Sequence, residues 1–178
     1  RHFNKTLEQE GIATQTRNPD VVARRIRNQI DKSRPQIKSY LEQYPLTPAV
    51  LVLFDNAKNS YIDPYAIQTA LHGYEQVVFQ VGPTASEPVV VDCGFAQRNN
   101  KALRQDKNRH LSALATLDEH WELKTPHRRS LALAVYHNPF ADIPLKPSLW
   151  YADHIQHFVI DEKRAGQYQN WRRINPTN

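Results

Sequence analysis

Apolar residues recur at helical spacing early in the chain and then give way to a continuous apolar run. The recurring positions keep one face of a 3.6-residue period, with Ser33 in the one vacant place. They are Val22, Ile26, Ile30, Ile37, Leu41 and Tyr44. This pattern predicts a helix from about Pro19 to Gln43. Because Pro35 lies inside it and proline removes a helical hydrogen bond, we expect one helix with a bend near residues 31–34.

The apolar run at residues 48–54 follows this helix closely. Its length and β-branched content predict a strand buried on both faces, as in a sheet covered by helices. Next, Asp63 and Pro64 form a helix start and Gly73 a helix stop. A second apolar run follows at 76–81, so the region reads strand, helix, strand. This order predicts a parallel strand pair joined by a right-handed crossover.

The remaining pattern predicts further strands separated by polar segments. The expected strands are 88–92, 110–117, 131–137 and 154–160. We expect 97–109 and 118–129 to be exposed polar loops, the first of them mobile and strongly basic. Residues 1–18 carry no period and are interpreted as an irregular lead-in, the remnant of a longer N-terminal part. The prediction is a single α/β domain over 1–178, with a mixed central sheet flanked by helices.

Composition restricts the class of protein. With 178 residues, 40% of them hydrophobic, the chain can bury one sizeable core. No apolar run approaches the ~20 residues that a membrane-spanning helix needs, so no membrane partner is expected. Cys93 is the single cysteine, which excludes an intrachain disulfide and fits a reducing compartment. We therefore expect a cytoplasmic protein.

Positive charge adds a candidate partner. The formal net charge is +5 and the isoelectric point is near 9.4, which favours an anionic partner such as DNA. Basic residues gather in the predicted helix and in the polar segment 97–109, and a merely solvated basic surface is the alternative interpretation. The residues expected to contact backbone phosphates are Lys32, Arg34, Lys101, Lys107 and Arg109.

The helix also carries Gln36-Ile-Lys-Ser-Tyr40, a Q-x-x-x-Y pattern that precedes an apolar strand. In this position the pattern resembles the motif that follows the catalytic strand in RecB-like and related PD-(D/E)XK nucleases. Fragments at 50–56, 70–73, 108–113 and 136–141 resemble segments of uncharacterised bacterial members. The resemblance implies a restriction-endonuclease-like core, or its C-terminal portion. It also implies that Gln36 and Tyr40 support the active site of a DNA endonuclease dependent on Mg²⁺ or Mn²⁺.

Nucleases of this superfamily need an acidic residue and a nearby E-x-K on adjoining strands. The carboxylates hold the metal ion, which activates water and stabilises charge on the phosphate. Ahead of Val21 the acids are Glu8, Glu10 and Asp20, and none begins an E-x-K. An alternative register within the chain joins Asp92 to Glu122-Leu-Lys124, and a D-x-K also occurs at 161–163. The metal ligands therefore stay unassigned.

Other candidate sites are less well supported by their spacing. His154 and His157 would point to opposite faces of a strand, so they could not chelate one ion together. Asn138 follows a predicted strand and is expected to lock a turn. Three functions stay open, namely a metal-dependent endonuclease, a catalytically degenerate nuclease fold acting as a DNA-binding or assembly subunit, and a protein-interaction module. Homo-oligomerisation or membership of a larger complex stays open as well.

Overall fold

The structure is a computed structural model that describes residues 19–54, 62–80, 89–95, 101–121, 129–150, 152, 154–160 and 171–174. Only the backbone is described at 19, 75, 77–80, 89–94, 118–121 and 129–130. The helical elements are α2 (Pro19–Gln43), α3 (Pro64–Leu71) and a 3₁₀ turn at Pro147–Leu149. The strands are β1 (Val50–Phe54), β2 (Glu75–Gln80), β3 (Val89–Phe95), β4 (Ala113–Trp121), β5 (Arg129–His137), β6 (Ile155–Ile160) and β7 (Trp171–Ile174).

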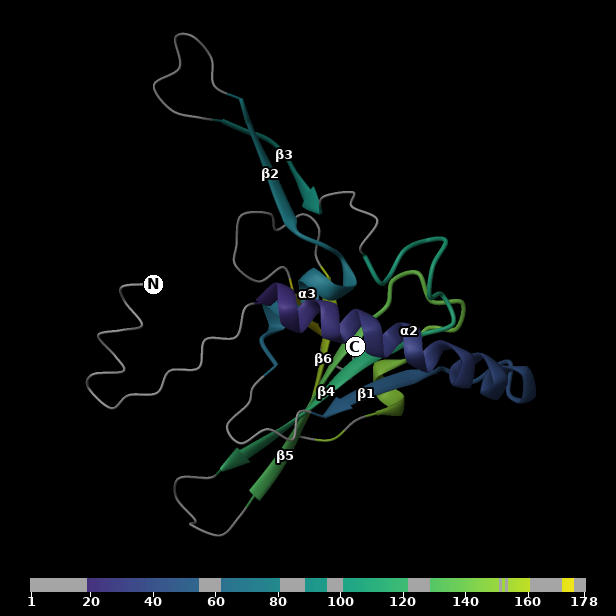
Figure 1. The fold of residues 1–178 in the computed structure, drawn as a ribbon. Coiled ribbons are helices and arrows are strands. Elements are labelled where there is room, and N and C mark those ends of the chain that lie inside the picture. Colours follow the sequence, from purple (N-terminus) through teal and green to yellow (C-terminus); the bar gives the residue numbers. More distant parts are fainter. Residues whose placement is uncertain are drawn as a thin grey trace.

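A mixed five-stranded sheet forms the centre of the fold, in the order β1-β4-β5-β6-β7. The β1–β4 and β5–β6 pairs are parallel, whereas the β4–β5 and β6–β7 pairs are antiparallel. Strands β2 and β3 form a separate antiparallel ribbon, which extends away from the sheet (Figure 1). The predicted α/β class with a mixed sheet is confirmed.

The two faces of the sheet are covered differently. Helices α2 and α3 pack on one face (Figure 1), where Ile30 and Leu71 join Leu114 and Tyr136 in one core cluster. On the other face Ala115, Val135 and their neighbours pack against Leu145 and Trp150. The alternation of side chains along a strand explains why Leu114 and Ala115 belong to different clusters. In the described structure α-helices therefore cover one face, and a proline-containing segment covers the other.

Two predictions about β1 are wrong. The strand does not pair with β2; it lies beside β4, with Val50 opposite Ala113, while β2 turns back onto β3. It is also not buried on both faces, because it forms the edge of the sheet and leaves Val52 and Phe54 45% and 56% exposed. An apolar run shows that a strand forms, but packing of distant segments decides its neighbours.

The predicted exposed loop at 97–109 is also wrong where the structure describes it. Ala102 and Leu103 are buried, and their N–H groups donate to the carbonyls of Ala70 and Leu71 at 3.0 Å each. These bonds attach residues 101–110 to the end of α3. Similarly, β4 continues to Trp121, so residues 118–121 are strand and not loop.

Helix α2 has the predicted bounds and includes Pro35. Ile26 and Ile30 are buried in the core against the sheet, as the period predicts, and Ala23 is buried beside them. Tyr44, which the period placed on the same stripe, lies just beyond the helix and is 51% exposed. Ser33, in the vacant place on the apolar stripe, donates its hydroxyl to the Gln29 carbonyl at 2.8 Å. No helix in the described part of the chain is long and apolar enough to cross a membrane.

Candidate nucleic-acid interface

The solvent side of α2 carries four exposed cationic residues. At about 100° per residue they fall within an arc of about 140°, centred opposite the buried stripe. Among the described residues, none of the four has a hydrogen-bond or ion-pair partner. They are Arg24, Arg25, Lys32 and Lys38. Their charges therefore face water and are available to an anionic partner.

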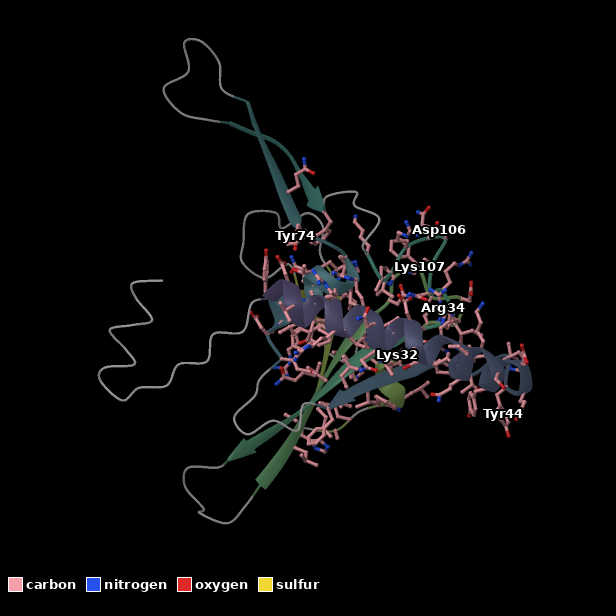
Figure 2. The ribbon with its side chains drawn as sticks, viewed as in Figure 1. Lys32, Arg34, Tyr44, Tyr74, Asp106 and Lys107 are labelled. Atoms are coloured by element: carbon pink, nitrogen blue, oxygen red, sulfur yellow. The ribbon has the colours of Figure 1, made fainter. Side chains whose placement is uncertain are left out.

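Residues 101–110 bring a second basic segment alongside α2. Arg34 donates to Asn108 Oδ1 from Nε at 3.0 Å and from Nη2 at 2.8 Å. One turn away, Lys107 Nζ lies 3.5 Å from Asp31 Oδ1, which also pairs with Arg34 at 3.3 Å. Figure 2 shows Arg34 and Lys107 close together beside the helix. These contacts join two basic segments through residues that lie more than seventy positions apart in the sequence.

Asn108 is the residue that shapes this junction. Its φ of 59° places it in the left-handed region, which asparagine tolerates better than most residues. While Oδ1 accepts from Arg34, Nδ2 donates to the Ala102 carbonyl at 2.7 Å. The Asn108 carbonyl in turn accepts from Leu111 N at 3.0 Å and from Asn138 Nδ2 at 3.2 Å. Every polar group of the side chain is therefore used for structure.

Asn138 and Ser112 connect this junction to the sheet. Asn138 Nδ2 also donates to the Leu111 carbonyl at 2.7 Å, and its Oδ1 accepts from Phe140 N at 2.9 Å. Ser112 Oγ accepts from Ala49 N at 3.0 Å and donates to the Ile143 carbonyl at 2.5 Å. The turn-locking role predicted for Asn138 is confirmed.

These two segments account for the net positive charge of the chain. Helix α2 and residues 101–110 together hold ten Lys and Arg and four Asp and Glu, a formal charge of +6. The whole chain carries +5, so the other residues sum to −1. Such concentration on neighbouring elements, rather than a basic composition throughout, is typical of a surface that binds a polyanion.

His110 lies beside the same positive charges. Partial burial lowers the pKa of His110, and the charges of Arg34 and Lys38 lower it further, while Asp142 opposes them. Asp142 itself forms an ion pair with Arg109. The neutral form of His110 is therefore favoured beside this surface.

The five predicted phosphate-contacting residues have different roles in the structure. Lys32 is exposed and has no described partner, so it fits the prediction best. Arg34 and Lys107 hold the junction, while Arg109 is paired with Asp142. Lys101 Nζ donates to the Phe95 carbonyl at 3.2 Å. That candidate set omitted three exposed cations that the helical period could have selected, Arg24, Arg25 and Lys38.

The predicted catalytic residues are not assembled into a site among the described residues. Gln36 and Tyr40 are exposed on α2, and the Tyr40 ring lies 4.8 Å from that of Tyr44. In the part of the chain that the structure describes, no three His, Cys, Asp or Glu residues group to hold a metal ion. The side chain of Asp92, all of Glu122-Leu-Lys124, and residues 161–163 lie outside the described residues.

A buried histidine pair lies on the other face of the sheet. His137 Nε2 and His157 Nδ1 are 2.9 Å apart, and His157 Nε2 is 2.9 Å from the Trp150 carbonyl. Because a carbonyl only accepts, a neutral His157 donates from Nε2, and its Nδ1 then accepts from Nε2 of His137. Burial and the neighbouring His157 lower the pKa of His137 to about 4. Sequence spacing missed this pair because β5 and β6 bring it together.

Comparison with protein-family models, curated proteins and solved structures found no match to this chain. An inference about function therefore starts from the basic surface, from its geometry and from the sequence resemblance.

Proposed function

We propose that the chain binds nucleic acid through the basic surface of α2 and residues 101–110. The observation that carries the proposal is the +6 formal charge on these two joined segments, against +5 for the whole chain. Arg24 and Lys38 lie fourteen residues apart on α2, which corresponds to about 21 Å along the helix. That length matches about six phosphates of one strand at an axial spacing of 3.4 Å.

The shape of the charged surface supports an extended polyanion as the ligand. Four cations that have no partner among the described residues follow one side of a 25-residue helix instead of converging on a point. Tyr40 and Tyr44 add half-exposed rings at the C-terminal end of the same helix. Exposed aromatic rings beside a cationic track provide stacking positions for bases of a single strand. We assign the phosphate contacts to the cations and the stacking contacts to the tyrosines.

DNA-binding affinity tests this proposal directly. Fluorescence anisotropy with labelled single- and double-stranded 20-mers at low salt would measure the dissociation constants of the wild type and two variants. Lys32→Gln combined with Lys38→Gln should weaken binding roughly tenfold or more, because two phosphate contacts are lost. Lys146→Gln, an exposed lysine beyond the surface, is the matched control and should change little. No DNA binding at low salt would favour the protein-interaction module.

The resemblance to PD-(D/E)XK nucleases extends the proposal to metal-dependent phosphodiester hydrolysis. Glu122-Leu-Lys124 directly follows β4, which ends at Trp121, and Asp92 lies in β3. In this proposal Gln36 and Tyr40 support the active site. In the alternative register Asp92 and Glu122 hold Mg²⁺ or Mn²⁺, and Lys124 assists. The lone Cys93 is consistent with a cytoplasmic enzyme. A degenerate fold that binds DNA without cutting it is the alternative.

Plasmid cleavage distinguishes an active endonuclease from a degenerate fold that only binds DNA. Purified chain would be incubated with supercoiled plasmid and Mg²⁺ or Mn²⁺, with EDTA as the metal-free control. An active enzyme nicks or linearises the plasmid only with metal, and Glu122→Ala abolishes this activity, whereas Glu42→Ala at the end of α2 retains it. Salt-sensitive binding without cleavage would identify a DNA-binding or assembly subunit.

A further inference from the structure

A cavity of about 140 Å³ opens beside the N-terminal half of α2. Helix α2 provides three lining residues, and the end of α3 and the segment after it provide most of the rest. Figure 2 shows Tyr74 next to this half of the helix. The cavity lining includes Asp20, Arg24, Arg27, Thr69, Tyr74 and Lys101. We call this cavity the α2–α3 pocket.

The α2–α3 pocket is positively charged. Arg24 and Arg27 are three positions apart, so they are neighbours on one side of α2. Lys101 joins them because the next two residues are hydrogen-bonded to the end of α3. Within the described part of the chain, none of the three cations forms an ion pair. Three cationic side chains and one carboxylate, Asp20, make the formal charge of the lining +2.

The neutral groups of the lining add hydrogen-bonding capacity. Thr69 is 2% exposed, and its Oγ1 is a buried atom with no hydrogen-bond partner among the described residues. A buried hydroxyl without a partner costs free energy, and a ligand oxygen would remove that cost. The Thr69 carbonyl already accepts from Arg27 Nη1 at 3.4 Å, which holds the guanidinium against α3. Asp20 accepts a hydrogen bond from the Tyr74 hydroxyl, which raises the pKa of Tyr74 and keeps it protonated.

We propose that the α2–α3 pocket binds a phosphate monoester. A monoester carries about −1.5 to −2 at neutral pH, which matches the +2 lining, whereas each internal phosphate of a nucleic acid carries −1. An empty apolar cavity of about 150 Å³ admits a benzene molecule, so this volume suffices for a phosphate group. Guanidinium groups also match phosphate oxygens in geometry.

The monoester comes either from a free nucleotide or from the terminal phosphate of a nucleic-acid strand. The second source rests on the proposed nucleic-acid binding, and the first does not. In both cases Arg24, Arg27 and Lys101 neutralise the phosphate, and the Thr69 hydroxyl donates to one of its oxygens. The pocket, with Arg24 at its border, would thus recognise a strand end, while Arg25, Lys32 and Lys38 contact internal phosphates.

Amide chemical shifts measure occupancy of the pocket directly. The ¹⁵N-labelled chain would be titrated with inorganic phosphate, thymidine 5′-monophosphate and thymidine 3′,5′-cyclic monophosphate. Saturable shifts at the amides of Thr69 and Gly73 are expected with the first two. The cyclic diester should bind at least about tenfold more weakly, because it carries a single charge. Absence of shifts at these amides, or equal binding of the diester, would overturn the proposal.

Matched variants test the lining residues. Arg24→Gln should weaken nucleotide binding by about tenfold or more, since it removes a charge-assisted contact. Arg172→Gln, an exposed arginine on β7, is the control and should bind as the wild type does. Thr69→Val keeps the shape of the side chain but lacks the hydroxyl, so it should fold and bind less tightly. Equal affinities in Arg24→Gln and its control would contradict the proposal.

Oligonucleotides distinguish the two sources of the monoester. A strand with a terminal phosphate should bind more tightly than the same strand ending in hydroxyls, and Arg24→Gln should remove that difference. Nucleotide binding without oligonucleotide binding would keep the pocket and reject the proposed nucleic-acid function. Oligonucleotide binding that ignores the terminal phosphate, together with no nucleotide binding, would reject the pocket and keep that function.

Discussion

Single polar side chains decide how the basic surface is assembled. Asn108 joins α2 to residues 101–110, and Asn138 joins that segment to the end of β5. Both are nearly fully buried, and both use their amide groups on backbone carbonyls. Their replacement would leave buried donors and acceptors unpaired, which costs more than a hydrogen bond contributes.

Asn108→Ala should destabilise the chain by about 2 kcal/mol or more, because the Ala102 carbonyl and Arg34 lose their partner. The variant Asn108→Gly separates this loss from the left-handed backbone, which glycine adopts freely. We expect the glycine variant to be about 1 kcal/mol more stable than the alanine variant. Urea unfolding measures both, and equal stabilities would show that the φ of 59° costs alanine nothing.

His72 is a second residue whose environment has a measurable consequence. It is 3% exposed and lies between the rings of Phe95 and Trp171, at 5.7 and 5.5 Å. Burial, assisted by the charge of Lys101, lowers its pKa from 6.5 to about 3. The unfolded chain therefore binds a proton below pH 6.5 that the folded chain does not bind until about pH 3. The contribution of neutral His72 to the free energy of unfolding is therefore fully present above pH 6.5 and decreases as the pH is lowered below that value.

At pH 5 protonation of His72 in the unfolded chain lowers the free energy of unfolding by about 2 kcal/mol, because each pH unit below 6.5 contributes about 1.36 kcal/mol. His72→Phe removes the titrating group and keeps an aromatic ring. Its unfolding free energy should change by about 2 kcal/mol less between pH 7.5 and pH 5 than that of the wild type. The titration of His137 lowers the free energy of unfolding at acid pH in both proteins alike, so its effect cancels from this comparison. Parallel pH profiles would show that His72 is accessible to protons in the folded state.

Elements differ in how far the sequence predicts them. The bounds of α2 follow from a period that is read within the segment, and the structure has them as predicted. The neighbours of β1 do not follow from any local pattern, because Val50 pairs with Ala113, sixty-three residues away. The cationic side of α2 was likewise predictable, whereas Lys101 reaches Arg24 and Arg27 only through the hydrogen bonds of Ala102 and Leu103. Local patterns therefore predict elements and charge, and tertiary contacts decide sites.

Pro35 lies in the interior of α2. Inside a helix, proline lacks one hydrogen bond and costs about 3 kcal/mol relative to alanine. Pro35 is exposed, so Pro35→Ala should stabilise the chain by about 1 to 3 kcal/mol and raise its melting temperature. Pro45→Ala, just beyond the end of α2, is the control and should change stability little. A loss of stability in Pro35→Ala would mean that the predicted bend is needed for packing.

The net positive charge of the molecule is concentrated in one region. Because α2 and residues 101–110 carry +6 and everything else sums to −1, one region accounts for the positive character of the chain. Six of its ten cations already contact a carboxylate, Asn108 or a backbone carbonyl. The remaining four, on α2, have no partner in the part of the chain that the structure describes, so they are the groups that would release counterions from a nucleic acid.

The salt dependence of DNA binding measures the number of these phosphate contacts. With four phosphates neutralised, the slope of log K against log salt concentration should be about −3.6 for duplex DNA and about −2.8 for a single strand. Removal of two contacts in Lys32→Gln combined with Lys38→Gln should bring the duplex slope to about −1.8. Lys146→Gln should keep the wild-type slope. A slope unchanged by the double substitution would place the bound phosphates away from this side of α2, even if binding itself were tight.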